Sequence, residues 1–310
     1  MISTVFSIRN PCLPAGRRTR HSAIRKGVEV WQNSGYKKAM ESYFEERSIL
    51  FNASSEFSCP DDCERYGCKE PELHVSISLV DLLAISATSG RKPSDVFKKD
   101  CKIGFDPIKE GEPWLGRISI ELKKPCSFLG GKECSVYRGR PIACALFPEY
   151  SLMVGSREDL LKREIFRNFP CIQGPCSIPW RRRETLEKLM EMSLQEAFLS
   201  DFYLFGISPF VLDLKPMAGA GLDGIRISED GKAELPHRCI EDLVFRILEQ
   251  GGYLQEWEAK MEKLDCAEGL RQFIEMKGWT DQMAMTAHQI LPAVAYQLDG
   301  NRLFPIHRCK

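Results

Sequence analysis

The chain has 310 residues, of which 43% are apolar and 28% charged, a composition typical of a globular protein with one large domain or two ordinary ones. Lysine and arginine together number 43, as do aspartate and glutamate, so the formal net charge is zero. That balance gives no support to nucleic acid or an anionic membrane surface as the main partner.

Residues 1–39 differ in composition from the remainder of the chain. Six basic residues precede Glu29 without a single acidic one, a pattern found in transit peptides and in disordered basic arms. The apolar runs along the chain are far shorter than the ~18 to 20 residues of a membrane helix, and no secretory signal is evident. We predict a disordered extension, or a natural start at Met40, and a cytoplasmic protein.

Residues 40–180 are predicted to form a loop-rich domain. Ser78 and Asp81 form a capping-box-like pattern that begins a short helix, which Gly90 ends. A second short helix is expected from Pro93 to near Gly104. The remaining elements expected in this domain are a strand at 117–122, a hairpin at 127–136 around Gly130-Gly131, a strand at 151–154 and a helix at 158–167.

Residues 181–310 are predicted to be helical. Apolar side chains recur at spacings of three and four in 186–198, in 240–248 before Gly251-Gly252, and in 254–264. The pattern continues at 270–274, and a last helix is expected at 280–298 with a kink at Pro292. Residues 215–233 are glycine-rich and fit a hairpin. The expected fold class is α+β and mostly α: a loop-rich cysteine-cluster domain with a small β-hairpin, followed by a helical C-terminal region packed on it.

Cysteine is concentrated in one part of the chain. Nine of the thirteen cysteines lie between Cys59 and Cys176, and core thiols placed by chance would not gather in this way. Disulfide frameworks are typical of small secreted domains, whereas clustered cysteines in a chain of this size without an export signal more often bind metal. The pattern favours a metal site, with disulfides or inert buried thiols as the alternatives.

The clustered cysteines fall into three groups, each on a predicted loop or turn. Thiolates are the ligands that soft metals prefer, and ligands distant in sequence can converge on one centre when each lies on a turn. Guanidinium groups or backbone amides nearby would offset the negative charge of several thiolates. The predicted ligands are Cys59, Cys63 and Cys68 in the first group, Cys126, Cys134 and Cys144 in the second, and Cys171 and Cys176 in the third, with Cys101 as a further candidate.

The scarcity of histidine bears on the choice of metal. His74 is the single histidine between Cys59 and Cys176. Mixed cysteine/histidine zinc sites and catalytic zinc are therefore poorly supported, which leaves all-thiolate zinc or an iron–sulfur cluster. We expect His74 to be a strand or loop residue and not a ligand.

Several segments of the chain resemble a known family. FSCPDDCERYGC, ISLVDLLAIS, PCSFLGGKECSVYRGRPIACALFP and FPCIQG are similar to the YkgJ-type cysteine-cluster proteins over about residues 57–176. The most specific pattern is C-x7-C-S-V-Y-x2-R-P-x2-C-x2-F-P, carried by Cys126, Cys134, Tyr137, Arg140, Pro141, Cys144, Phe147 and Pro148. The resemblance implies a zinc- or iron-chelating domain, or a protein that holds an iron–sulfur cluster.

The first cysteine motif departs from the family pattern. C-x2-C-x2-C-C is typical of the family, whereas here the spacings are looser and Lys69 follows Cys68. One thiolate is therefore missing, and Cys101, Cys176 or a backbone or solvent ligand would replace it. Flagellin lysine N-methylases share this type of cluster, so the resemblance also implies protein-lysine methylation as an alternative. No strand followed by a G-x-G turn marks a site for S-adenosylmethionine.

We therefore expect a metal-binding protein that holds an iron–sulfur cluster, of the 4Fe–4S type, with zinc as the second choice. A cluster-dependent transferase resembling protein-lysine N-methylases and a structural zinc module for protein interactions are the alternatives. Whether the protein is an enzyme is left open. A protein partner is left open too, and we expect neither nucleic acid nor a membrane as partner.

Overall fold

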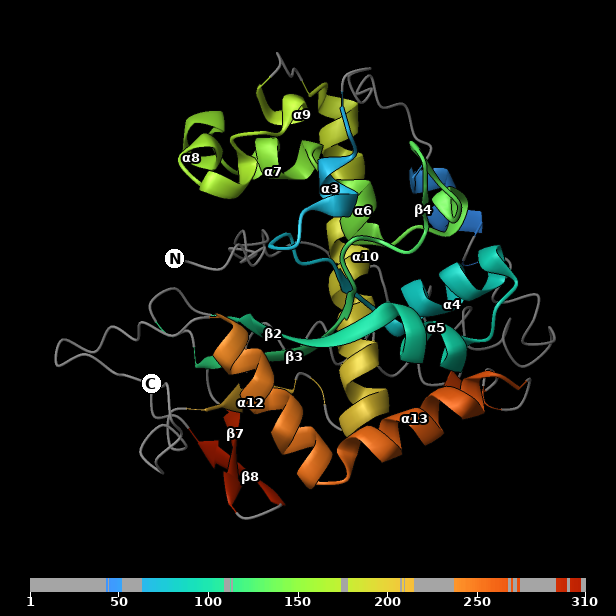
Figure 1. Cartoon of the computed structure of the whole chain (residues 1–310), viewed down its shortest axis with the longest axis vertical. Helices are drawn as coiled ribbons and strands as arrows, with labels where there is room; N and C mark the ends of the chain where they lie inside the picture. Colours follow the sequence, from blue (N-terminus) through green and yellow to red (C-terminus); the bar gives the residue numbers. More distant parts are fainter. Residues whose placement is uncertain are drawn as a thin grey trace, which may run out of the picture. The chain divides into compact units, whose positions relative to one another are not determined.

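The computed structural model describes residues 43, 45–51, 63–108, 112, 114–173, 178–206, 208, 210–214, 237–266, 269, 272–273, 294–299 and 302–307 (Figure 1). Helix accounts for 61% of these residues and strand for 13%. The predicted class, mixed α+β and mostly helical, is thus confirmed. Among the helices within this described part, none combines the length and apolar character that crossing a membrane requires.

The described residues divide into two compact units. We call residues 40–102 with 121–197 the cysteine unit, and residues 103–120 with 198–310 the sheet unit. The chain enters the sheet unit at residue 103, returns at 121 and enters it again at 198. The predicted extension 1–39 lies outside the described residues, and the predicted domain boundary at residue 180 stays a prediction.

The first helices of the cysteine unit follow the predicted caps. Helix α4 (Leu79–Ser89) begins with a capping box, in which Ser78 Oγ accepts from the Asp81 N–H (2.9 Å) and the Asp81 carboxylate accepts from the Ser78 N–H (3.0 Å). Gly90 ends the helix at φ 68°, a conformation that glycine adopts without a Cβ penalty. Helix α5 (Pro93–Asp100) stops short of the predicted end, because the next residues form strand β2 (Cys101–Pro107).

The predicted hairpin is confirmed and is short. Strands β4 (Leu129–Gly130) and β5 (Glu133–Cys134) pair antiparallel, with Leu129 opposite Cys134 and Gly130 opposite Glu133. Gly131 lies in the turn at φ 65°. The predicted strand at 117–122 is confirmed as β3 (Leu115–Leu122).

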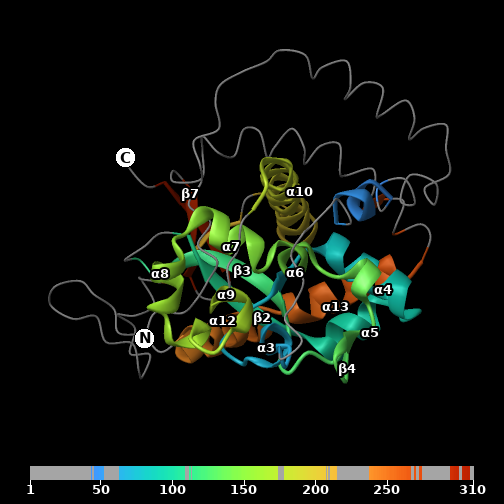
Figure 2. The ribbon, with the colours of Figure 1, turned by 90° about the horizontal axis from the view of Figure 1, so that it is seen from above.

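The remaining elements of the cysteine unit with assigned labels are one short strand, several short helices and the start of one long helix. They are α3 (Tyr66–Lys69), strand β1 (Ser76–Ile77), the 3-10 helix η1 (Tyr137–Gly139), α6 (Ile142–Leu146), α7 (Glu149–Val154), α8 (Arg157–Leu161), the 3-10 helix η2 (Glu164–Phe166), α9 (Pro170–Gln173) and α10 (Trp180–Phe205), which continues into the sheet unit. Helices α7, α8 and α9 lie side by side (Figures 1 and 2). Side chains of α8 and α9 contribute to an apolar cluster, against which Leu152 of α7 packs. The cluster consists of Leu73, Leu160, Phe166, Phe169, Cys171 and Ile172.

In this stretch one predicted element is wrong and another is shorter than predicted. The expected strand at 151–154 is helical, as part of α7, because the first turn of that helix is fixed by a buried ion pair: Arg182 Nε donates to Glu149 Oε2 at 2.9 Å. Local alternation is a weak signal over four residues, and this tertiary contact overrides it. The expected helix at 158–167 ends at Leu161 and resumes as the 3-10 helix η2.

The sheet unit combines strands with a pair of helices. Within it, β3 pairs antiparallel with β6 (Leu212–Asp213), which pairs parallel with β7 (Val294–Asp299), and β7 forms an antiparallel hairpin with β8 (Arg302–His307). Helices α12 (His237–Gln250) and α13 (Tyr253–Leu264) contact each other across Gly251-Gly252, and both confirm the predicted helical periodicity.

The last predicted helix is wrong where it can be compared. Residues 294–298 are strand instead, because β7 pairs along its whole length with β8. Residues 280–293, and the hairpin predicted within 215–233, lie outside the described residues.

Candidate metal centre

Three cysteines of the cysteine unit, Cys68, Cys126 and Cys134, lie on segments that backbone hydrogen bonds join together. Cys68 belongs to α3, Cys126 precedes the β4–β5 hairpin, and Cys134 ends β5. The Cys126 N–H donates to the Cys68 carbonyl at 2.8 Å, and the Leu129 N–H donates to the Cys126 carbonyl at 3.1 Å. The hairpin therefore starts against α3, and both cysteines of its ends are held near Cys68.

Electrostatics links Cys144, which belongs to α6, to the same group. Burial raises the pKa of the Cys144 thiol, and Cys68 and Cys126 raise it further. Burial likewise raises the pKa values of Cys68 and Cys134, and Cys126 adds to both shifts. We call Cys68, Cys126, Cys134 and Cys144 the four-thiol group. Its members are electrostatic neighbours although they come from three separate segments of the chain.

Two cations favour the thiolate forms within this group. Lys124 lowers the pKa values of Cys68 and Cys144, and Arg65 lowers that of Cys68. Both cations are anchored on the same loops as the thiols, since Lys124 Nζ donates to the Gly67 carbonyl and Arg65 Nε donates to the Lys132 carbonyl at 2.7 Å. The loops thus supply thiols and compensating charge together.

Arg140 is the third cation of the site. Its charge lowers the pKa of Cys134, and Cys144 also lies within its electrostatic reach. The guanidinium is held by aromatic rings, with its centre 3.9 Å from the ring centroid of Tyr137 and 5.1 Å from that of Phe51. Arg140 Nη1 also donates to the Tyr137 carbonyl at 2.9 Å. Arg140, which precedes Pro141 and α6, therefore delivers a fixed positive charge close to Cys134 and Cys144.

Gly139 allows the segment before Arg140 to pack closely on helix α4. A Cβ at this position would lie 2.2 Å from Thr88 Oγ1 and 2.4 Å from the Ala84 carbonyl oxygen. The 3-10 helix η1 therefore packs its backbone directly on α4, just before Arg140 and α6. A side chain at residue 139 would push this segment off α4.

The other cysteines predicted as ligands lie outside the four-thiol group. Cys63 is buried in the loop before α3. Cys171 lies in the apolar cluster with Phe166 and Phe169. Burial and the neighbouring Asp100 raise the pKa of Cys101 to about 12, so this thiol at the start of β2 is protonated at neutral pH. The ligand roles of these three cysteines stay predictions, and Cys59 and Cys176 lie outside the described residues.

The described thiols are not in contact at a common point. The eight described cysteines with recorded side chains, Cys63, Cys68, Cys101, Cys126, Cys134, Cys144, Cys171 and Cys266, form no disulfide with one another. Within the part of the chain that the structure describes, no three sulfur atoms lie within 4.8 Å of one another. The four-thiol group is thus defined by its neighbouring loops and its electrostatics.

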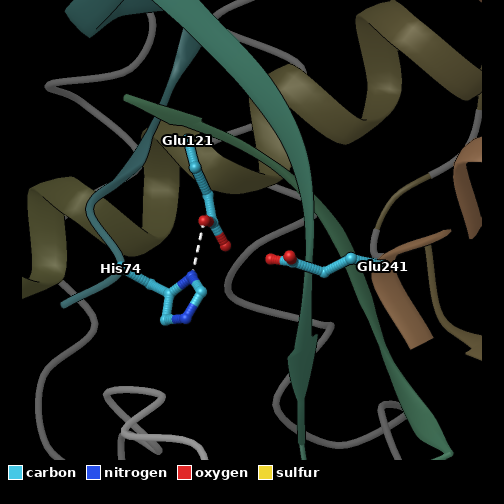
Figure 3. Close-up of side chains that lie close together, drawn as sticks. All are labelled: His74, Glu121 and Glu241. Atoms are coloured by element: carbon cyan, nitrogen blue, oxygen red, sulfur yellow. Dashed lines mark hydrogen bonds and ion pairs between the residues drawn. The ribbon is translucent and has the colours of Figure 1, made fainter. Parts of the chain in front are cut away.

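Sequence reasoning missed a buried ion pair beside β1. His74 lies in the loop before this strand, and its Nδ1 is 2.7 Å from Glu121 Oε2. Figure 3 shows the His74 ring and the Glu121 carboxylate turned toward each other. Glu121 is completely buried, and Lys102 Nζ lies 3.2 Å from the same oxygen. The sequence feature that could have indicated this pair is Glu121 itself, a charged residue in a predicted strand beside apolar residues. Glu241, also drawn in Figure 3, belongs to helix α12 of the sheet unit.

The Glu121 pair predicts a pH dependence of stability. Burial alone would raise the pKa of this carboxyl, but the hydrogen bond with His74 and the charge of Lys102 outweigh it and lower the pKa. A carboxyl with a lowered pKa contributes stability above its unfolded pKa of about 4.3, and this stability is lost as the pH falls through the folded value. Glu121→Gln should therefore lower the free energy of unfolding by about 1 to 3 kcal/mol at pH 7.

Urea unfolding of wild type and Glu121→Gln at pH 7 and pH 3 measures this effect. The difference between the two proteins should be largest at pH 7 and shrink in acid. Glu72→Gln, which changes an exposed carboxylate in the loop preceding His74, is the matched control and should leave the midpoint unchanged. Equal midpoints for wild type and Glu121→Gln at pH 7 would contradict the prediction.

Comparisons of the chain with protein-family models, with curated proteins and with solved structures gave no match. The resemblance to the YkgJ-type proteins therefore rests on the quoted motifs.

Proposed function

We propose that this protein binds metal through the thiolates of the four-thiol group, and that the bound group is an iron–sulfur cluster. The observation that carries the proposal is that Cys126 raises the pKa values of Cys68, Cys134 and Cys144, although the four cysteines come from three segments of chain. The backbone bond between Cys126 and Cys68 supports the same grouping. Four thiols are also the number of ligands that such clusters use.

The charge around the thiols suits a metal. The partly buried thiols with raised pKa values, Cys68, Cys134 and Cys144, hold their protons, and a metal ion displaces those protons because it stabilises the thiolates directly. The thiolates then leave net negative charge on the centre, which Lys124, Arg65 and Arg140 would offset. An iron–sulfur cluster supplies electron-transfer chemistry or structural cross-linking when bound. The chain itself positions the partly buried thiols and anchors the three cations beside them.

The donor set guides the choice between iron–sulfur and zinc. All members of the four-thiol group are cysteines, and His74 is engaged with Glu121. This set fits an iron–sulfur cluster or all-thiolate zinc, and the YkgJ-type motif favours the cluster. Reduced thiols in such a site require a reducing compartment, which supports the cytoplasm as the location of the protein.

Metal content after anaerobic purification of the full chain tests the proposal. We expect stoichiometric iron and acid-labile sulfide with broad absorption near about 400 nm. A colourless protein with stoichiometric zinc would contradict the iron–sulfur cluster and indicate a zinc site on the same thiols. A protein that holds no metal after purification, and takes up neither zinc nor iron with sulfide on reconstitution, would overturn the proposed function.

A further inference from the structure

Helix α6, which carries Cys144, has no cap of its own. Pro141 stands at its N-cap position, and proline offers no side-chain oxygen to the first N–H groups of the helix. The cap comes from a distant part of the chain instead: the Ile142 N–H, at the first position of α6, donates to Asp81 Oδ1 at 3.0 Å. The residue that fixes the start of α6 thus lies on helix α4.

Asp81 therefore fixes the starts of two helices with one carboxylate. Its Oδ2 accepts from the Ser78 N–H at the beginning of α4, and its Oδ1 accepts from the Ile142 N–H at the beginning of α6. The residue is 3% exposed, so water cannot replace either bond. The charge of Asp81 also reaches Cys144, the third residue of α6.

A buried ionic network holds Asp81 in turn. Arg47, which is 2% exposed and belongs to the helical residues 45–51, donates through Nη2 to Asp81 Oδ1. Its Nε donates to Glu196 of α10 at 3.1 Å, and Ser78 Oγ donates to the same carboxylate at 2.6 Å. The Asp81 carboxylate consequently has a fixed position relative to three helical segments of the cysteine unit.

The network also reaches Arg140. Arg47 lies over the ring of Phe51 with its guanidinium centre 5.1 Å from the ring centroid, and Arg140 lies at 5.1 Å from the centroid of the same ring. The segment 140–142, which leads into Cys144, is therefore held at both of its ends, through Phe51 at Arg140 and through Asp81 at Ile142.

We infer that Asp81 is a positioning residue of the candidate metal centre, which holds Cys144 within the four-thiol group by capping helix α6 from helix α4. This inference rests on the proposed function for its biological meaning. The structural part of the inference, that Asp81 fixes the position of Cys144, can be measured with or without metal.

The test compares Asp81→Asn and Asp81→Ala with a matched pair, Asp201→Asn and Asp201→Ala. Asp201 of the sheet unit is also 3% exposed, is paired with Arg117 (2.8 Å) and accepts from the Phe210 N–H at 3.0 Å. It reproduces the buried Asp–Arg pair and the bond to a backbone N–H, in the other unit. The asparagine variants keep an oxygen acceptor and the side-chain shape, so they remain informative where an alanine variant does not fold.

The first readout is the alkylation rate of each cysteine in full-length, metal-stripped protein, followed by mass spectrometry. Cys101, buried in the same unit, reports general opening of that unit. We expect the ratio of Cys144 to Cys101 labelling to rise at least about tenfold in Asp81→Asn and further in Asp81→Ala. The bond to the Ile142 N–H is weakened in the first variant and lost in the second, and this bond holds the start of the helix that carries Cys144. The Asp201 variants should leave this ratio within about twofold of wild type. A ratio unchanged in the Asp81 variants would overturn the inference.

The second readout is the release of metal from anaerobically purified protein to an excess of chelator. Release should be at least about tenfold faster in Asp81→Asn than in wild type, a loss typical of residues that orient a ligand, and unchanged in Asp201→Asn. Equal release from both variants would overturn the positioning role. Wild-type protein that holds no metal after purification and takes none up on reconstitution would overturn the proposed function, while the labelling ratio still decides whether Asp81 positions Cys144.

Discussion

Replacement of Cys126 by serine is expected to abolish stoichiometric metal binding. Cys126 influences the pKa values of Cys68, Cys134 and Cys144, and its N–H donates to the Cys68 carbonyl. It is therefore the member of the four-thiol group that neighbours all the others. A serine hydroxyl keeps the size of the side chain but is a hard, neutral donor that soft metals bind poorly. The metal affinity should fall by more than about 100-fold, beyond the loss that outer-shell residues cause.

Iron, sulfide and zinc contents of the purified variant, with its visible spectrum, measure this loss. Cys266→Ser is the matched control, because Cys266 is an exposed cysteine of the sheet unit whose thiol donates to the Lys263 carbonyl. This control should retain full metal content. Wild-type iron content in Cys126→Ser would show that the ligands lie elsewhere among the cysteines.

Replacement of Arg47 by methionine should produce the largest loss of stability. Arg47 is the shared partner of Asp81 and Glu196, which are 3% and 2% exposed. Methionine fills a similar volume but leaves two buried carboxylates without their countercharge, and breaking a buried pair in this way costs about 3 to 5 kcal/mol. The free energy of unfolding, obtained from urea titrations followed by circular dichroism, should fall by this amount at pH 7.

The same variant has a second, pH-dependent signature. Burial raises the pKa of the Glu196 carboxyl, and Arg47 lowers it. Without Arg47 the pKa should rise further, and a carboxyl whose folded pKa exceeds its unfolded value gains stability as the pH falls. The deficit of Arg47→Met relative to wild type should therefore shrink between pH 7 and about pH 5. The control Lys162→Met removes a cation from an exposed pair with Asp159 and should leave the midpoint unchanged at both pH values. A deficit that is the same at both pH values would contradict the assignment to Glu196.

The local signals of the sequence were sufficient for elements with clear ends. The capping box of Ser78 and Asp81, the closing Gly90 and the turn at Gly131 each act within a few residues, and the structure has them where they were predicted. Strand β7 was misassigned because its partner β8 had no signal of its own in the sequence. Short apolar runs suit a helix or a strand equally, and pairing decides between them.

In the candidate site, too, local features could be predicted from the sequence and contacts between distant residues could not. The grouping of Cys126, Cys134 and Cys144 around a hairpin could be predicted, since turns and spacing are local. The anchoring of Lys124 on the Gly67 carbonyl could not, because it joins residues far apart in the sequence. Asp81 was predictable only as the cap of its own helix. Its second bond, to the Ile142 N–H, exists only in the folded chain.

The distribution of the four thiols over three segments bears on the order in which a growing chain can complete the site. Between Cys68 and Cys126 the chain passes through the sheet unit and back, and Cys144 follows still later. Metal held by Cys68 and Cys144 would close a long loop, and the entropy of closing it increases only slowly with its length. During synthesis, however, such a metal could be fully bound only after residue 144 had left the ribosome. The metal would thus be bound completely only after α3, the β4–β5 hairpin and α6 have been synthesised. It would act as a late cross-link between these segments.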